Sequence, residues 1–213
     1  MKFDCSLYLV ADTGTTEKKK LWEKVGSAIK GGCTMVQLRE KDGTMKEFYQ
    51  DAAALKRITD VYGVPLIIND RLDLMLALDA QGIHVGQKDM PASVVRQLIG
   101  TEKIMGVSAH NLEEAVRAER DGADYIGVGA MFSTNTKKDA KSVTIKTLQE
   151  IAKAVSIPIV AIGGINHRNV KYLRETGING IAVVSAILGE IQAYDAAKRL
   201  KNEISSILNM ENE

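Results

Sequence analysis

The chain is poor in cysteine, proline and aromatic residues. Its 213 residues include two cysteines, three prolines and 5% Phe, Trp and Tyr. Cys5 and Cys33 are too few for a disulfide framework and form no CxxC pair, so we expect free thiols in a reducing compartment. With one tryptophan and three phenylalanines, stacking of aromatic rings on nucleic-acid bases is not expected.

Long apolar runs and a dominant sign of charge are also missing. No apolar run reaches the roughly 18 to 20 residues of a membrane span, and residues 1–5 contain no apolar signal-peptide region. Lys and Arg number 28 against 27 Asp and Glu, a formal net charge of +1. We therefore predict a protein with no nucleic-acid or membrane partner, and the free thiols indicate a cytoplasmic location. A homo-oligomer is compatible with the sequence but does not follow from it.

Short β-branched runs alternate with segments of helical period along the whole chain. The expected strands are 6–11, 34–39, 66–69, 82–85, 103–108, 125–129, 158–162 and 180–184. The expected helices are 18–30, 44–62, 71–78, 91–99, 111–121, 144–154, 166–175 and 194–208, with Asn111 as an N-cap and Pro91 at the first helical position. Eight such units predict an α/β fold, a single (β/α)8 TIM barrel that forms one domain over residues 1–213. The competing open, doubly wound sheet would more often carry a GxGxxG turn, which is absent.

In this barrel class the chemistry lies at the carboxyl ends of the strands. Gln37, Arg39 and Lys41 alternate along the second strand and so share one face, pointing into the barrel mouth. Two cations and an amide there suit a polyanion such as a diphosphate. The alternative is a strand end held by ion pairs with Glu40 and Asp42.

Two aspartates follow the third and fourth strands. Asp70 and Asp89 lie on neighbouring loops, because adjacent strands are about 5 Å apart, and could share one hard cation. Mg2+ takes one or two carboxylates and completes its shell with water and phosphate oxygens. The alternative is that both aspartates cap the following helices.

Other strand ends carry further candidates. Ser108, after the fifth strand, could donate to a ligand or cap the next helix. The polar connection from Thr134 to Asp139 is the longest in the chain and could cover a substrate. Gly163-Gly164 and Val184-Ser185 end the seventh and eighth strands, the frequent phosphate site of this fold. His84 faces the barrel interior, and we interpret it as a hydrogen-bonded core residue rather than a catalyst.

Taken in order, these segments resemble the thiamine phosphate synthase family from about residue 8 to residue 187. The similarity is carried by residues 37–41, 69–71, 84–87, 89–91, 106–108, 123–129, 134–137, 161–165 and 183–185. Each segment alone is modest, but the ordered set is specific.

The resemblance implies a reaction and a role for each matching residue. The family joins a hydroxymethylpyrimidine diphosphate to a thiazole phosphate, usually carboxylated, and releases pyrophosphate. The C–O bond to the diphosphate breaks first, and the thiazole nitrogen then adds to the pyrimidine cation. The pyrimidine diphosphate would be held by Gln37, Leu38, Arg39, Glu40, Lys41, Asn69, Ser108 and Lys137. Asp70 and Asp89 would ligate Mg2+. The thiazole phosphate would be held by Thr134, Asn135, Thr136, Gly164, Val184 and Ser185. Lys137, Arg39 and Ser108 would be the catalytic residues.

Three other functions are weighed against this one. The related thiazole tautomerases share the barrel but lack the amide at Gln37, the segment from Gly86 to Asp89 and the Thr-x-Thr-Lys loop. A non-catalytic barrel that binds thiamine precursors would be expected to have lost Asp70, Asp89 or Lys137. An unrelated phosphate-binding barrel enzyme would need only the glycine pair and the end of the eighth strand.

Overall fold

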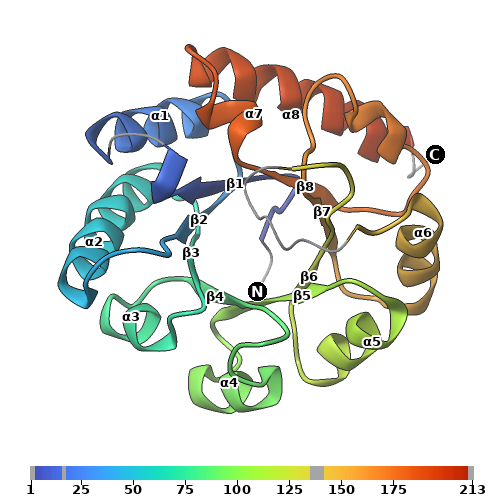
Figure 1. The fold of residues 1–213 in the computed structure, drawn as a ribbon, viewed down its shortest axis with the longest axis horizontal. Coiled ribbons are helices and arrows are strands. Elements are labelled where there is room, and N and C mark those ends of the chain that lie inside the picture. Colours follow the sequence, from blue (N-terminus) through green and yellow to red (C-terminus); the bar gives the residue numbers. More distant parts are fainter. Residues whose placement is uncertain (1–2, 16–17, 135–141, 211–213) are drawn as a thin grey trace.

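The computed structural model, which describes residues 3–15, 18–134 and 142–210, is a closed barrel of eight parallel strands. The strands follow one another around the barrel in chain order, and β8 pairs with β1 to close it (Figure 1). They are β1 (Leu7–Asp12), β2 (Met35–Arg39), β3 (Leu66–Asn69), β4 (Gly82–Val85), β5 (Ile104–Ala109), β6 (Tyr125–Val128), β7 (Ile159–Ile162) and β8 (Gly180–Val183). The predicted (β/α)8 barrel is confirmed.

Helices form a ring around the strands (Figure 1). The α-helices are α1 (Lys18–Lys30), α2 (Met45–Tyr62), α3 (Leu72–Ala77), α4 (Ala92–Ile99), α5 (Leu112–Arg120), α6 (Ile145–Ala154), α7 (Ser185–Leu188) and α8 (Ala193–Met210). Two short 3-10 helices, η1 (Thr13–Thr15) and η2 (Val170–Leu173), complete the described elements. Among the described residues, no helix is both long enough and apolar enough to cross a membrane.

One predicted helix is shorter than expected, and one helix was not predicted. The segment 166–175 forms only the 3-10 helix η2. There the Asn166 side chain accepts from the Arg168 amide at 2.9 Å and the Asn169 side chain from the Asn166 amide at 2.8 Å. Such local bonds compete with helical ones. After β8, a short helix α7 that the sequence did not predict ends at Gly189, and α8 then covers the predicted helix 194–208.

Helix starts mostly follow the sequence signals. Thr44 and Glu47 form a reciprocal capping box at α2, and Asn111 caps α5 as predicted, accepting from the Glu114 amide at 2.9 Å. Pro91, predicted at the first helical position, lies at the N-cap of α4, whose first residue is Ala92. The helix therefore begins one residue later than predicted.

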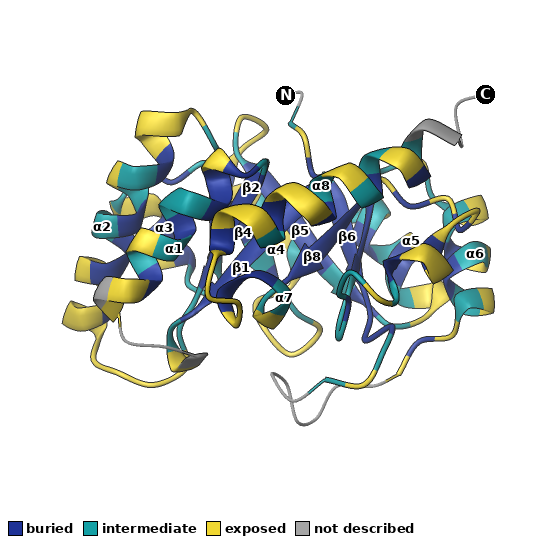
Figure 2. Ribbon diagram, turned by 90° about the horizontal axis from the view of Figure 1, so that it is seen from above, coloured by how far each residue is buried: buried dark blue, intermediate teal, exposed yellow. Residues whose placement is uncertain are grey.

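Alternate residues of each strand face two different apolar layers. One layer, between strands and helices, is made of aliphatic residues such as Leu9, Leu38 and Ile68. The other fills the barrel and includes Tyr8, Met35 and Tyr125. Figure 2 shows the strands buried in the centre and the helices exposed on their outer sides. The inward residues at the strand ends are the ones left to form a site.

Candidate functional site

The carboxyl ends of β1 to β5 bring polar side chains to one end of the barrel, which we call the mouth. The inward residues there are Asp12, Arg39, Asn69, His84 and Ser108. Register places Asp12 beside Arg39 and Asn69 beside His84. Side chains alternate between the two faces of a strand, and this alternation directs these five into the mouth. Arg39 was predicted to point there and His84 into the barrel interior, whereas Asp12 was not predicted.

Arg39 is held by an ion pair with Asp12. The side chains are 14% and 12% exposed, so water screens the pair only partly. The alternative partners, Glu40 and Asp42, are not the ones used. Sequence analysis missed Asp12 because the expected first strand stopped at residue 11. Its acidic side chain at a strand end was the available signal.

Glu40 and Leu38, predicted to bind the pyrimidine diphosphate, direct their side chains away from the mouth. Leu38 is fully buried in the layer beneath the helices. Glu40 accepts from Lys18 Nζ at 3.1 Å, and Lys18 also donates to Asp51 at 2.5 Å. These two residues could therefore meet a ligand only through their backbone. The network instead anchors the β2–α2 loop to α1 and α2.

Asp70 and Asp89 come together at the ends of β3 and β4. Asp70 has a left-handed backbone conformation, with φ of 61°, and its amide donates to the His84 carbonyl at 2.9 Å. Partial desolvation, followed by a hydrogen bond and repulsion from Asp89, raises the pKa of Asp70 to about 7. A hydrogen bond with Asn69 and the positive charge of Arg39 act to lower the pKa of Asp70. Asp70 therefore takes up a proton near neutral pH, beside the carboxyl group of Asp89.

Neither aspartate caps a helix. The N-cap positions of α3 and α4 are Arg71 and Pro91, without side-chain cap bonds. Asp89 instead accepts from the Gly86 amide at 2.7 Å, which fixes the loop that carries it. The helix-capping alternative is therefore wrong for both residues.

The donor set fits a magnesium ion. Asp70 lies beside Asp89 with a raised pKa, and a divalent cation could replace the proton that Asp70 takes up. Among the described residues, no group of three or more His, Cys, Asp or Glu side chains could hold a metal. A pair suits Mg2+, which keeps water and phosphate oxygens in its shell.

A cavity of about 200 Å³ lies beside this pair. Its lining comes from the β2–α2 loop, the end of β3 and α2: Glu40, Lys41, Asp42, Gly43, Thr44, Phe48, Asn69, Asp70 and Arg71. Lys41 is exposed there, free to turn toward an anion in the mouth. The cavity thus continues the charged site outward from the strand ends.

Ser108 does not cap α5, since Asn111 does. Its Oγ lies 2.9 Å from Nε2 of His84, whose Nδ1 lies 3.0 Å from the Tyr125 hydroxyl. His84 is thus the hydrogen-bonded interior residue that the sequence predicted. Gln37, 5% exposed, donates from Nε2 to the Tyr8 hydroxyl at 2.7 Å.

The predicted phosphate site lies at the ends of β7 and β8. Gly163 and Gly164 have φ of 102° and 64°, and a Cβ on Gly164 would lie 2.4 Å from the Ser133 carbonyl oxygen. Ser185, which is exposed, follows Val184 at the start of α7. Thr134 is described and half-buried. The predicted residues Asn135, Thr136 and Lys137 lie outside the described residues.

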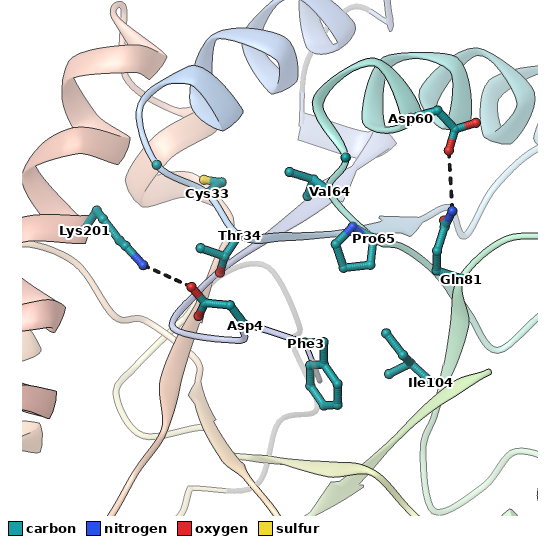
Figure 3. A pocket seen from close by; sticks show the side chains of 12 residues that line it. Phe3, Asp4, Cys33, Thr34, Asp60, Val64, Pro65, Gln81, Ile104 and Lys201 are labelled. Carbon is teal, nitrogen blue, oxygen red and sulfur yellow. Dashed lines mark hydrogen bonds and ion pairs between the residues drawn. The ribbon is translucent and has the colours of Figure 1, made fainter. Parts of the chain in front are cut away.

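A larger cavity, about 720 Å³, lies at the opposite end of the barrel (Figure 3). Its charged side chains already have partners: Lys201 lies 3.5 Å from Asp4, and Gln81 donates to Asp60 at 3.4 Å. It brings together no pair of carboxylates and none of the predicted site residues. Size alone therefore does not identify the site, and we assign the chemistry to the mouth.

Comparison with known proteins finds similar sequences and a similar solved structure. A family model described as thiamine monophosphate synthase matches residues 7–187. The thiamine-phosphate synthase of Clostridium tetani is 57% identical over 92% of this chain and 94% of its own. That of Methanobrevibacter smithii is 51% identical over 95% and 97%. A solved thiamine phosphate pyrophosphorylase from Pyrococcus furiosus superposes with a TM-score of 0.87 at 37% identity, over 95% of this chain and 96% of that one. The chain belongs to the thiamine monophosphate synthase family.

Proposed function

We propose that the mouth joins 4-amino-5-hydroxymethyl-2-methylpyrimidine diphosphate to a thiazole phosphate, carboxylated or not. The products are thiamine phosphate and pyrophosphate, together with CO2 when the thiazole is carboxylated. The protein is then a transferase, the thiamine-phosphate synthase that its relatives' names indicate. The observation that carries the proposal is the Asp70–Asp89 pair beside Arg39, a built place for a metal-bound diphosphate.

The two substrates occupy different parts of the mouth. Gln37, Asn69 and Ser108 hold the pyrimidine, while Arg39, Lys41 and Lys137 face its diphosphate. The loops after β6, β7 and β8 hold the thiazole phosphate through Thr134, Asn135, Thr136, Gly164, Val184 and Ser185. Positive φ at Gly164 lets the backbone approach a phosphate closely. Leu38 and Glu40 contribute by backbone only.

The chemistry needs a stabilised leaving group and no protein nucleophile. The C–O bond between the pyrimidine methylene and the diphosphate breaks with both electrons going to oxygen, and the thiazole nitrogen then forms the new C–N bond. Arg39 and Lys137 oppose the charge that builds on the departing diphosphate. Mg2+ held by Asp70 and Asp89 would add further charge neutralisation there when bound.

We also propose that the barrel acts as one catalytic domain in the cytoplasm. Cys5 and Cys33 are both buried and free, as expected of thiols in a reducing compartment.

Pyrophosphate release tests the proposal. Purified protein is mixed with both substrates over a range of Mg2+ concentrations, and thiamine phosphate is measured in parallel. We expect release that needs Mg2+ and both substrates. Asp89→Asn should raise the Mg2+ requirement by about 10-fold or more, with thiazole phosphate binding unchanged. Asp195→Asn, on the exposed face of α8, is the matched control.

Each other outcome points to a different protein. Unchanged Mg2+ dependence in Asp89→Asn would remove the metal role. Binding of both ligands without release would indicate a precursor-binding barrel. Isomerisation of the thiazole without condensation would indicate a tautomerase.

A further inference from the structure

We propose that a chain of hydrogen bonds through the barrel interior sets the donor and acceptor pattern that the mouth offers to a pyrimidine. Tyr8, Tyr125 and His84 are then positioning residues that determine specificity without touching the substrate. The inference rests on the proposed function, because it concerns how the pyrimidine half of that site selects its ligand.

The chain joins side chains from five different strands. Gln37 Nε2 donates to the Tyr8 hydroxyl at 2.7 Å, and this hydroxyl lies 3.0 Å from the Tyr125 hydroxyl. The Tyr125 hydroxyl lies 3.0 Å from His84 Nδ1, and His84 Nε2 lies 2.9 Å from Ser108 Oγ. The two ends, Gln37 and Ser108, are predicted pyrimidine-binding residues on β2 and β5. The middle three residues link them beneath the mouth.

The direction of the chain follows from its first member. An amide nitrogen only donates, so the Tyr8 hydroxyl accepts from Gln37 and its single proton goes on to Tyr125. Tyr125 likewise passes its proton to Nδ1 of His84. The imidazole is then neutral, with its proton on Nε2, and donates to Ser108. Ser108 therefore keeps its own proton for a partner in the mouth.

The barrel is built around this chain. Tyr8 and Tyr125 are 2% and 0% exposed, where an unpaired hydroxyl is costly. Room for the rings comes from glycine. A Cβ on Gly106 would lie 2.1 Å from Cζ of Tyr125 and 2.5 Å from Nδ1 of His84, and one on Gly127 would lie 3.1 Å from Cε1 of His84. An apolar barrel core would need neither the hydroxyls nor this space.

The pattern suits an aminopyrimidine. With its nitrogen bound to Tyr8, Gln37 has its carbonyl oxygen left to accept from an exocyclic amine, while Ser108 donates to a ring nitrogen. A 4-oxopyrimidine has the opposite pattern, a carbonyl acceptor with the proton on the ring. Binding it would require reversing every bond in the chain and turning the Gln37 amide. The chain thus couples the two ends, because turning the Gln37 amide places its oxygen on the Tyr8 hydroxyl and reverses the bonds from Tyr8 to Ser108.

Removal of one buried hydroxyl tests the coupling. Binding of the 4-amino and 4-oxo forms of the hydroxymethylpyrimidine monophosphate is measured by calorimetry for wild type, Tyr125→Phe and Tyr8→Phe. We expect wild type to favour the amino form and each variant to lose about 10-fold or more of that preference. Affinity for thiazole phosphate should not change. Tyr172→Phe, whose ring is on the surface, is the control and keeps the wild-type preference.

A second measurement reports the direction itself. Nitrogen NMR shifts of His84 in wild type should show the neutral form protonated on Nε2, and Tyr125→Phe should shift it toward a mixture of tautomers. An unchanged amino preference in a folded variant, or wild-type His84 protonated on Nδ1, would overturn the proposal. If one variant does not fold, the other makes the same test. Wild-type protein that binds neither pyrimidine would instead contradict the proposed function, and the NMR result would still stand.

Discussion

The acidic residues of the mouth carry more negative charge than Arg39, the cation paired with Asp12, can balance. Asp12 is matched by Arg39, but Asp70 faces Asp89 and is partly desolvated. This arrangement costs stability in the absence of metal, because the folded protein holds a carboxylate where it prefers a carboxylic acid. Such local cost at a functional site is common, and a bound cation would remove it.

This cost in folding stability predicts that the effect of Asp70→Asn on stability depends on pH. A pKa raised from 3.8 to about 7 means that the folded protein binds a proton the unfolded chain has released. The metal-free wild type should therefore lose stability as pH rises from about 4 to about 7, with no further loss above. Asp70→Asn should remove this loss and be more stable at pH 8 by about 1 kcal/mol, discounted because the side chain meets solvent.

Urea unfolding with chelator at several pH values makes this measurement. Asp195→Asn should keep the wild-type slope. A variant no more stable than wild type at pH 8, or a gain that appears only at acidic pH, would contradict the raised pKa.

The sequence located the residues that directly follow a strand, but not those whose role depends on a partner from another strand. Arg39, Asp70 and Asp89 follow strands directly, so counting along each strand located them. Asp12 needed the register of β1 against β2, which pairs it with Arg39. Tyr8 and Tyr125 are far apart in sequence and look like ordinary core residues. Only closure of the barrel brings their hydroxyls within 3.0 Å.

At the scale of elements, strands were predicted better than helices. Buried parallel strands are continuous apolar runs, which a sequence shows directly. Helices depended on local competition, and η2 is short because Asn166 and Asn169 bond to nearby backbone. Glycines within strands had a role that sequence pattern could not show. Gly106 in β5 and Gly127 in β6 face inward and make room for rings from other strands.

We predict that Gly106→Ala destabilises the barrel by about 1–3 kcal/mol. The added methyl would overlap the Tyr125 ring, which can move only by breaking its bonds to Tyr8 and His84. Denaturant unfolding provides the value. Gly26→Ala in α1, where the nearest atom to a Cβ is 3.9 Å away, should be neutral or stabilising. Equal stability of the two variants would show that the interior adapts to a methyl group.

The whole molecule separates function from stability along the barrel axis. The mouth holds described residues of the predicted site such as Arg39 and Asp70. The opposite end holds the larger cavity and paired charges such as Lys201 with Asp4 (Figure 3). This division is typical of the fold. The periodicity of the sequence was therefore enough to predict the barrel. The site could be predicted only from the residues at the carboxyl end of each strand.

Lys201→Met should therefore affect stability alone. Lys201 donates to Ser6 at 2.5 Å and lies 3.5 Å from Asp4, so its loss should cost about 1 kcal/mol of unfolding free energy. The value of kcat/KM should stay within about twofold of wild type, since a surface change far from the mouth alters no substrate contact. Lys146→Met, at an 87% exposed lysine of α6, is the control. A large fall in kcat/KM for Lys201→Met would show that the two ends are coupled.

Closure of the sheet has a consequence for association with other proteins. Each described strand is bonded to a neighbour on both sides, from the β1–β2 pair around to the β8–β1 pair. An extended peptide can join a sheet only at a free edge, and these strands offer none. A partner therefore cannot bind the described strands by strand addition and must bind the helices or the loops.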